Sequence, residues 1–294
     1  MRPRIASART TAPRCGATEL LVIDQGAVLA WGVAQLRDLP WRSERDPWAI
    51  LVAEVMLQQT RAERVIPKWR EFLAVHPHPA DCASASLADV LRLWQGLGYP
   101  RRARNLKATA ELVSAHHGGR LPDDLDALLA LPGIGPYTAR AVLAFAFERD
   151  VGVVDTNIAR VLARTTGERL SPKRAQAVAD SAVPHEHGWI WNQVMMDLGA
   201  TLCRPTPRCG DCPLAATCAW HRRGHPDPDP SVGSAGVSGR QAAFEGSARQ
   251  ARGRVLAALH EGARPVAEFD VGVLDTLVAD GLVEVRESFV SLPA

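Results

Sequence analysis

The feature that most constrains this chain of 294 residues is a short segment with four cysteines, CRPTPRCGDCPLAATC. The spacing C-x5-C-x2-C-x5-C is formed by Cys203, Cys209, Cys212 and Cys218. Four thiolates so close together are the ligand set of one [4Fe–4S] cluster. Zinc also takes four cysteines, but zinc ribbons usually pair two distant C-x-x-C knuckles, and only Cys209 and Cys212 form one here. The segment therefore favours a single [4Fe–4S] cluster, with zinc as the alternative.

A cytoplasmic location argues against disulfide bonds as the role of these cysteines. The N-terminal segment MRPRIASARTTAPRCGATELLVI is charged but has no apolar stretch long enough for a secretory signal peptide. No apolar run approaches the roughly 20 residues that span a bilayer, so we expect no membrane partner. Closely spaced cysteines in a cytoplasmic protein are typical of metal ligands.

Shifts in composition divide the chain into four segments. Residues 1–17 are rich in Arg, Ala, Ser and Thr and are expected to be disordered. Residues 18–222 have almost purely helical periodicity and are expected to form an all-α body. Residues 223–248 are rich in Pro, Gly and Ser, which predicts a flexible linker. Residues 249–294 have the order helix, helix and two short strands, which resembles a small winged-helix module that we expect to be independently mobile.

The charge distribution is only weak evidence about a partner. The formal net charge is +2, while residues 249–294 carry five Arg and seven Asp or Glu, which gives −2. The remainder therefore has +4, a mild basic bias. Because attraction to phosphate comes from Lys and Arg, we expect the acidic tail to contribute little to nucleic-acid binding.

A tight Gly-x-Gly turn joins two predicted helices in LDALLALPGIGPYTARAVLAF. Gly133 and Gly135 permit backbone angles that other residues resist. The turn also leaves amide N–H groups exposed at the start of the second helix, where they form a phosphate site that reads no base sequence. The sequence therefore predicts a DNA-binding helix-hairpin-helix, with an ordinary helical hairpin as the alternative.

Two carboxylates are predicted to lie in opposite environments. Glu54 lies in WAILVAEVML, a helix that is apolar on nearly all faces. Burial raises the pKa of a carboxyl group, so Glu54 is a candidate general acid, although a structural ion pair is the alternative. Asp155 is predicted to cap the helix NIARVLAR, where backbone N–H groups favour the ionised form. Simple capping would explain Asp155 alone, but an acid beside an anion is the pair that glycosidic cleavage uses.

Several motifs in a fixed order give the chain a resemblance to a known family. They are LPWR, EVMLQQT, GLGYPRRARNL, LPGIGPYTA, VDTNIARVLAR, NQVMMDLGA and the cysteine segment, between Leu39 and Trp220. In these motifs the chain resembles the A/G-specific (MutY-type) adenine DNA glycosylases of the helix-hairpin-helix superfamily, which includes endonuclease III. The resemblance implies a mainly α, two-lobed fold. One lobe would be a six-helix barrel over residues 40–150, and the other would join residues 18–39 to the cluster loop in residues 151–222.

The resemblance also implies roles for individual residues. Glu54 would be the catalytic acid that protonates adenine and assists water, and Asp155, with Asn157 nearby, would stabilise the oxocarbenium ion. Tyr137 would lie against the reacting nucleotide. The residues expected to contact DNA, besides Gly133 and Gly135, are Arg42 near the extruded adenine, Gln58, Gln59 and Thr60 around the lesion pair, and Tyr99 as a wedge beside the opposing base. A turn aromatic is the alternative for Tyr99, and a solvated helix end is the alternative for the glutamines.

Two departures separate the chain from the family pattern. The first two cluster cysteines are typically separated by six residues in the family and by five here. Larger members also carry a C-terminal Nudix-like domain that helps recognise 8-oxoguanine, and the segment after the linker is too short for one. The chain thus resembles a truncated form of the family.

The sequence predicts a monofunctional DNA glycosylase of base excision repair. It would remove adenine paired with 8-oxoguanine or guanine in double-stranded DNA and leave an abasic site, as a monomer in the nucleoid-containing cytoplasm. Alternatives are a thymine glycosylase acting on G:T mismatches, an endonuclease III-type glycosylase/lyase, and a non-catalytic DNA-binding protein. A lyase needs a lysine nucleophile, and the hairpin has Tyr137 at that position.

Overall fold

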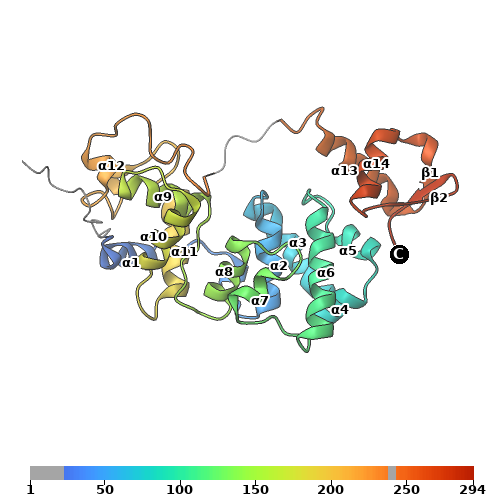
Figure 1. Ribbon diagram of the computed structural model, residues 1–294, viewed down its shortest axis with the longest axis horizontal. Coiled ribbons are helices and arrows are strands. Elements are labelled where there is room, and N and C mark those ends of the chain that lie inside the picture. Colours follow the sequence, from blue (N-terminus) through green and yellow to red (C-terminus); the bar gives the residue numbers. More distant parts are fainter. Residues whose placement is uncertain (1–22, 238–242) are drawn as a thin grey trace, which may run out of the picture.

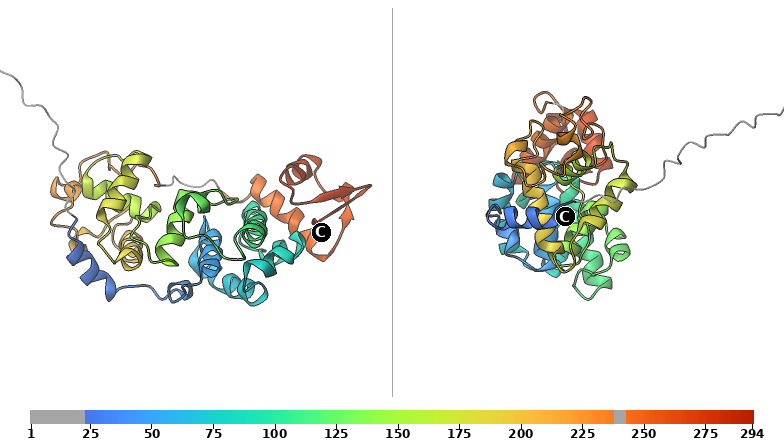
Figure 2. Two further views of the ribbon diagram at one scale, coloured as in Figure 1. Left: turned by 60° about the horizontal axis from the view of Figure 1, so that its bottom comes forward. Right: turned by 90° about the vertical axis from the view of Figure 1, so that its left-hand side faces the viewer.

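The computed structural model describes residues 23–237 and 243–294, and the segment 1–17 that we expected to be disordered lies outside these ranges. The described chain is mainly helical, with one small sheet near the C-terminus (Figure 1). None of its described helices is both long and apolar enough to cross a membrane. The helices form two groups with the C-terminal module beyond them, which the view in Figure 2 also separates.

The central group occupies residues 40–150. It consists of η1 (Pro40–Arg42), α2 (Pro47–Leu57), α3 (Ala62–Val75), α4 (Pro79–Ser84), α5 (Leu87–Leu93), α6 (Arg101–His116), α7 (Leu125–Leu129) and α8 (Pro136–Phe145). We expected six helices here, and the structure has seven, because Ala85 is extended and the Ser86 side chain caps a separate α5. Helix α2 packs against α3, α6 and α8. Its residues 48–56 are all buried, which explains why its sequence is apolar on every face.

The second group joins the N-terminal helix to the segment with the cysteines. It consists of α1 (Gln25–Val33), α9 (Thr156–Thr166), α10 (Pro172–Ala182), α11 (Gly188–Thr201), η2 (Cys209–Asp211) and α12 (Ala219–Arg222). Helix α11 packs against α1 and α9, and α12 packs against α9 (Figure 1). Contacts between α11 and α8 connect this group to the central one.

The C-terminal module has one more strand than we expected. It consists of α13 (Ala248–Ala258), η3 (Leu259–Glu261), β1 (Arg264–Pro265), η4 (Val266–Glu268), α14 (Val271–Ala279), β2 (Glu284–Arg286) and β3 (Phe289–Ser291). The antiparallel sheet has the order β1-β3-β2, with Val290 opposite both Arg264 and Val285. Val290 is buried and anchors the sheet against the helices.

Part of the segment that we expected to be a linker is packed against the second group. The Asp229 carboxylate forms an ion pair of 2.6 Å with Arg164, whose side chain is 2% exposed. The Ser234 hydroxyl accepts a hydrogen bond of 2.9 Å from the backbone N–H of Leu170. The Thr156 hydroxyl donates one of 2.8 Å to the carbonyl of Gly236. These contacts give residues 229–236 a fixed path despite their Pro- and Gly-rich composition.

The module is docked on α5 and α6, so the expectation of an independently mobile module is wrong. The backbone N–H of Ala88 donates to the carbonyl of Pro293 at 3.0 Å. Arg92 donates to the carbonyl of His260 at 3.2 Å. Arg104 donates to the carbonyl of Asp280. Composition did not reveal this docking because the partners are distant in sequence and each contact involves the backbone of the module.

Two truncations separate the contribution of residues 229–236 from that of the module. A chain that ends at Val237 keeps the Arg164–Asp229 pair, whereas a chain that ends at Arg223 leaves Arg164 buried without its carboxylate. Loss of one partner of a buried pair costs about 3–5 kcal/mol. We therefore expect the shorter chain to have a clearly lower Tm than the longer one, measured by circular dichroism. Equal Tm values for the two truncations would show that residues 224–237 do not stabilise the body.

Candidate active site

The hairpin brings a tyrosine into contact with the buried glutamate. Glu54 lies on α2 and is 5% exposed, and Tyr137 is in the first turn of α8. The Tyr137 hydroxyl donates a hydrogen bond of 2.7 Å to Oε2 of Glu54. Because Gly135 and Pro136 begin α8 directly before it, the hairpin turn fixes the direction of the tyrosine side chain.

Burial raises the pKa of Glu54 to about 7, as its apolar helix predicts. The hydrogen bond from Tyr137 lowers this pKa and the negative charge of Asp155 raises it, and the value of about 7 already includes both effects. A carboxyl group with this pKa is protonated in a substantial fraction of molecules at neutral pH. It is therefore able to donate a proton there.

Asp155 caps α9 as predicted. Its Oδ1 accepts a hydrogen bond of 2.6 Å from the backbone N–H of Ile158, and its Oδ2 accepts one of 2.9 Å from the side chain of Asn157. Burial raises the pKa of Asp155, and these donors, with the backbone N–H of Asn157, oppose that rise. The prediction that the two carboxylates lie in opposite environments is therefore wrong for burial, which raises the pKa of both groups. They differ in their donors: Asp155 faces three donors that favour the anion, and within the described residues Glu54 accepts one hydrogen bond, from Tyr137.

A buried arginine that the sequence analysis missed stands behind Asn157. Arg160 on α9 donates to the side-chain oxygen of Asn157 at 2.9 Å and to the backbone carbonyl of Cys203 at 2.6 Å. A continuous path of hydrogen bonds thus joins Asp155 to the first cysteine of the segment. The sequence places Arg160 and Arg164 four residues apart, on one face of α9, and both are buried.

The four predicted metal ligands converge on one pocket. The pocket lies between α9 and the cysteine segment, and the side chains of Cys203, Cys209, Cys212 and Cys218 all line it. Burial raises the pKa of the Cys212 thiol to about 11, so ionisation of this thiol calls for a cation in the pocket. Arg164 donates to the Cys203 sulfur at 3.5 Å. The soft donor set and its single pocket fit a four-thiolate metal centre.

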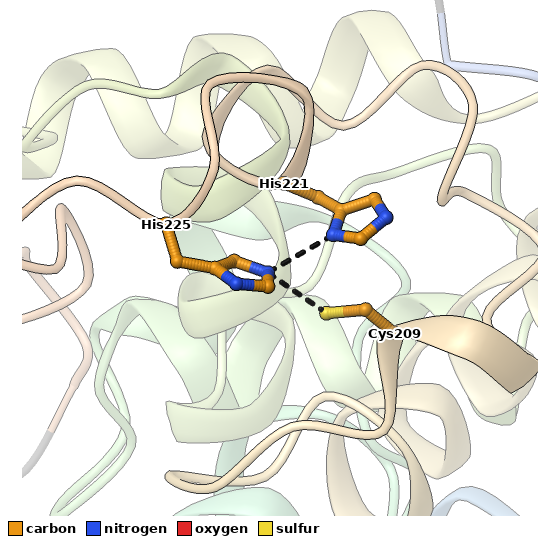
Figure 3. Close-up of side chains that lie close together, drawn as sticks. All are labelled: Cys209, His221 and His225. Carbon is orange, nitrogen blue, oxygen red and sulfur yellow. Dashed lines mark hydrogen bonds between the residues drawn. The ribbon is translucent and has the colours of Figure 1, made fainter.

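Two histidines that the sequence analysis missed lie against this pocket (Figure 3). His225 Nε2 is 3.4 Å from the Cys209 sulfur and 3.0 Å from Nδ1 of His221. The three ligand atoms all lie within 4.8 Å of one another. The spacing H-x3-H directly after the last cysteine was the signal that could have found them.

The segment Gln58–Thr60 is held by an arginine from α6. Arg102 donates to the backbone carbonyls of Val55, Met56 and Gln58 at 2.7, 3.0 and 2.7 Å, which satisfies the C-terminal end of α2. Burial lowers the pKa of Arg102 to about 10, so it remains charged at neutral pH.

The three side chains of this segment point to different partners. The Gln58 amide donates to the hydroxyl of Thr138 at 3.3 Å, and the Thr60 hydroxyl donates to the carbonyl of Leu97 at 3.1 Å. Gln59 is exposed and has a φ of +57°, an uncommon value for a residue other than glycine. The segment is thus fixed at both ends, with Gln59 projecting between them.

The expected wedge residue Tyr99 lies between two arginines. The guanidinium of Arg102 is 5.5 Å from its ring centroid, and that of Arg249 is 5.8 Å away. Arg249, on α13 of the C-terminal module, also donates a hydrogen bond of 2.8 Å to the Tyr99 hydroxyl. The module thus reaches a residue that the sequence analysis assigned to the DNA interface.

The two hairpin glycines are required for different reasons. Gly133 has a φ of +73°, and a Cβ atom there would lie 2.7 Å from the side chain of Asn105. Gly135 has a φ of −95° and a ψ of 177°, an extended conformation that any residue adopts. The prediction of special backbone angles is therefore correct for Gly133 and wrong for Gly135. A Cβ at position 135 would point into open space, where a side chain would obstruct the approach of a ligand to the backbone.

Arg42 is committed to a structural ion pair. Its guanidinium, 8% exposed, donates to both carboxylate oxygens of Asp197 at 2.7 and 2.8 Å. It also donates to the carbonyl of Arg37. A buried arginine needs such a partner, and the expectation that Arg42 lies near the extruded adenine stays a prediction. The sequence did not predict Asp197 as the partner of Arg42 because Asp197 lies 155 residues further along the chain.

Comparison with known proteins identifies the family. A family model described as "HhH-GPD superfamily base excision DNA repair protein" matches residues 52–184. An adenine DNA glycosylase of Mycobacterium tuberculosis is 44% identical over 87% of this chain and 88% of its own length. The chain belongs to the adenine DNA glycosylase family. Its relative in Mycolicibacterium smegmatis, also named adenine DNA glycosylase, is 40% identical over 87% of this chain and 91% of its own length.

Solved structures of the superfamily have the same fold. A thermostable thymine-DNA glycosylase is 30% identical, with a TM-score of 0.65 over 68% of this chain and 95% of that chain. A structure of endonuclease III trapped on DNA matches with a TM-score of 0.60 over 70% of this chain and all of that chain, at 23% identity. The mainly α helix-hairpin-helix glycosylase fold and the family resemblance inferred from the motifs are confirmed.

The pKa of Glu54 predicts how base release depends on pH. If Glu54 must be protonated, the single-turnover rate falls as pH rises through about 7. Tyr137 donates to the carboxylate form and lowers the pKa, so Tyr137→Phe should raise it and move the midpoint of the fall to higher pH. A midpoint that stays in place or moves to lower pH in Tyr137→Phe would contradict this role for the hydrogen bond.

The contact between Arg249 and Tyr99 predicts a role for α13 in DNA binding. We expect Arg249→Ala to weaken binding to a mispaired duplex by about tenfold, because a hydrogen bond from a charged donor contributes about 1.5–3 kcal/mol. Arg254→Ala is the matched control, since Arg254 is an exposed arginine on the same helix. Fluorescence anisotropy measures both Kd values, and an equal loss in the two variants would mean that general charge, not Tyr99, is responsible.

Proposed function

We propose that this protein is a monofunctional glycosylase that removes adenine paired with 8-oxoguanine or guanine in duplex DNA. The observation that carries the proposal is the buried pair of Glu54 and Tyr137 beside Asp155, within a chain 44% identical to an adenine DNA glycosylase. The product is an abasic site. One chain contains both carboxylates and all four cysteines, so a monomer suffices, and its substrate places the activity on nucleoid DNA in the cytoplasm.

The two carboxylates divide the chemistry of hydrolysis between them. Glu54 transfers its proton to the extruded adenine while the bond from C1′ to the base breaks and its electron pair leaves with the base. The Asp155 carboxylate, which accepts hydrogen bonds from Ile158 and Asn157, stabilises the positive charge that develops on the sugar. Glu54, now a carboxylate, then accepts a proton from the water molecule that attacks C1′. The proton balance closes, and the enzyme returns to its starting state.

Mispaired adenine is the favoured substrate because extrusion of a base costs a few kcal/mol and least for a mispair. Tyr99 stands on a fixed turn, and Gln58, Gln59 and Thr60 form a rigid segment at the end of α2. These groups would occupy the space that the extruded base leaves. The backbone at Gly135, where a Cβ would point into open space, would supply a contact to phosphate at the N-terminus of α8.

Lysine usage favours hydrolysis over the lyase alternative. The chain has three lysines, none of them in the hairpin. Lys68 is paired with Glu71, and Lys107 is paired with Glu111. Tyr137 hydrogen-bonds Glu54 and provides no amine for a Schiff base. Sequence identity favours adenine over thymine as the base removed. The chain is 30% identical to the thymine-DNA glycosylase, and 44% and 40% identical to the two bacterial adenine DNA glycosylases.

We further propose that the cysteine pocket holds one [4Fe–4S] cluster. The ligands would be Cys203, Cys209, Cys212 and Cys218, which line the pocket. Such a cluster supplies a rigid cross-link of the loop and one-electron redox chemistry. The path from the Cys203 carbonyl through Arg160 and Asn157 to Asp155 then ties the orientation of the catalytic carboxylate to the folding of this loop.

The substrate assignment is tested by single-turnover base release from duplexes with A:8-oxoG, A:G, A:C and T:G pairs. We expect fast release of adenine opposite 8-oxoguanine or guanine, no thymine release, and no borohydride-trapped Schiff base. Glu54→Gln should bind the A:8-oxoG duplex but lose base release by at least about 10²–10⁴-fold, since the amide cannot donate a proton. Thymine release, or wild-type rates in Glu54→Gln, would contradict the proposal.

The cluster assignment is tested by iron and acid-labile sulfide analysis of the purified protein. We expect about four of each per chain and a yellow-brown colour. Cys212→Ser should lose the iron, whereas Cys82→Ala should retain it, because Cys82 is buried in the hydrophobic core away from the pocket. Stoichiometric zinc in a colourless, active preparation would replace the assignment with the zinc alternative.

A further inference from the structure

The histidine pair beside Cys209 has no role in the glycosylase mechanism. Cys203 and Cys212 pack against the hydrophobic core. Cys209 begins η2 between the exposed residues Arg208 and Gly210, on the solvent side of the pocket. Figure 3 shows His225 pointing its ring nitrogen toward the sulfur of Cys209 and toward His221. Cys209 is also the ligand at which the first spacing is one residue shorter than the family pattern.

The geometry gives His225 one chemical role toward this sulfur. A cysteine that binds iron is a thiolate and accepts hydrogen bonds without donating one. His225 Nε2 lies 3.4 Å from that sulfur and 3.0 Å from Nδ1 of His221. Because the thiolate only accepts, the tautomer with a proton on Nε2 of His225 is the one that forms this hydrogen bond, and it offers the same N–H to Nδ1 of His221 when that nitrogen carries no proton.

The position of His225 is fixed by contacts on its other side. Its backbone has a φ of +59° and donates a hydrogen bond of 3.0 Å to the carbonyl of Trp220. Its ring centroid is 4.4 Å from that of Trp220, and the Trp220 indole donates to the carbonyl of Pro226 at 2.9 Å. Trp220 is in turn covered by the guanidinium of Arg164 at 4.6 Å. The turn after α12 thus returns His225 to the cysteine pocket in one orientation.

We propose that His225 donates a hydrogen bond to the Cys209 sulfur of the cluster, with His221 orienting it, and thereby sets the reduction potential and oxidative stability of the cluster. The inference rests on the [4Fe–4S] cluster proposed above. Hydrogen bonds to the ligand sulfurs and solvent exposure are two of the factors that set the potential of such a cluster. An N–H at the sulfur withdraws electron density, so it makes the cluster easier to reduce and harder to oxidise.

The test compares variants of the purified holoprotein. His225→Phe keeps a ring against Trp220 and removes the donor, whereas His225→Gln restores an N–H donor. His117→Phe, at an exposed position after α6, is the control for loss of a histidine elsewhere. Voltammetry gives the reduction potential, and the decay of visible absorbance in ferricyanide gives the rate of oxidative loss. Iron content and Tm verify that each variant is folded and loaded.

We expect His225→Phe to have a lower reduction potential and faster oxidative loss than the wild type at equal iron content. His225→Gln should recover part of both changes, and His117→Phe should change neither. A wild-type potential and decay rate in fully loaded His225→Phe would overturn the proposal while leaving the cluster assignment intact. A wild-type protein that purifies with one zinc ion, lost in both His225→Phe and His221→Phe, would also overturn the proposal. Cys209, His221 and His225 would then be the ligands of a separate metal site. An iron-free wild-type protein would instead refute the cluster assignment itself.

Discussion

The hydrogen bond between Tyr137 and Glu54 is the contact around which the active site is organised. A carboxyl group buried in the middle of α2 is costly unless it is neutral or hydrogen-bonded, and this one has a single donor and a pKa near 7. The donor, Tyr137, lies in the hairpin, and the tight turn at Gly133 precedes the start of α8. One interaction thus joins α2, which carries the buried carboxyl group, to the hairpin that we propose as the contact to the DNA backbone.

Helix α9 connects this site to the cysteine segment. Its first turn donates a backbone hydrogen bond to Asp155, and its middle carries two buried arginines, Arg160 and Arg164. Both arginines donate hydrogen bonds to backbone carbonyls at Cys203 and Arg204. Arg164 also forms an ion pair with the Asp229 carboxylate. A buried charge tolerates little movement of its partners. Disorder in the cysteine segment would therefore change the position of Asp155, which is connected to it by three successive hydrogen bonds.

Local signals in the sequence predicted the parts of the protein that depend on neighbouring residues. The all-round apolar pattern of α2 predicted the burial and raised pKa of Glu54, and the position of Asp155 before NIARVLAR predicted its cap. The sequence did not predict contacts between distant residues. The ion pair of Arg42 with Asp197, 155 residues away, was not predicted, and the position of Arg42 near the substrate stays a prediction. The sequence also contains no local sign that residues 229–236 pack on α9, because those contacts use backbone groups and a single carboxylate.

The C-terminal module separates its charges in space. The acidic total of residues 249–294 predicts little contact with DNA, and no contact here tests that prediction, but three of the five arginines lie on α13 and Arg249 donates to the hydroxyl of Tyr99. The acidic groups are elsewhere, and Asp280 pairs with Arg101 and Arg252 at the docking surface. Its carboxylate is thus used to fix the module on α6. The same segment therefore uses the carboxylate of Asp280 for attachment and directs the guanidinium of Arg249 to Tyr99, a division that only the folded arrangement reveals.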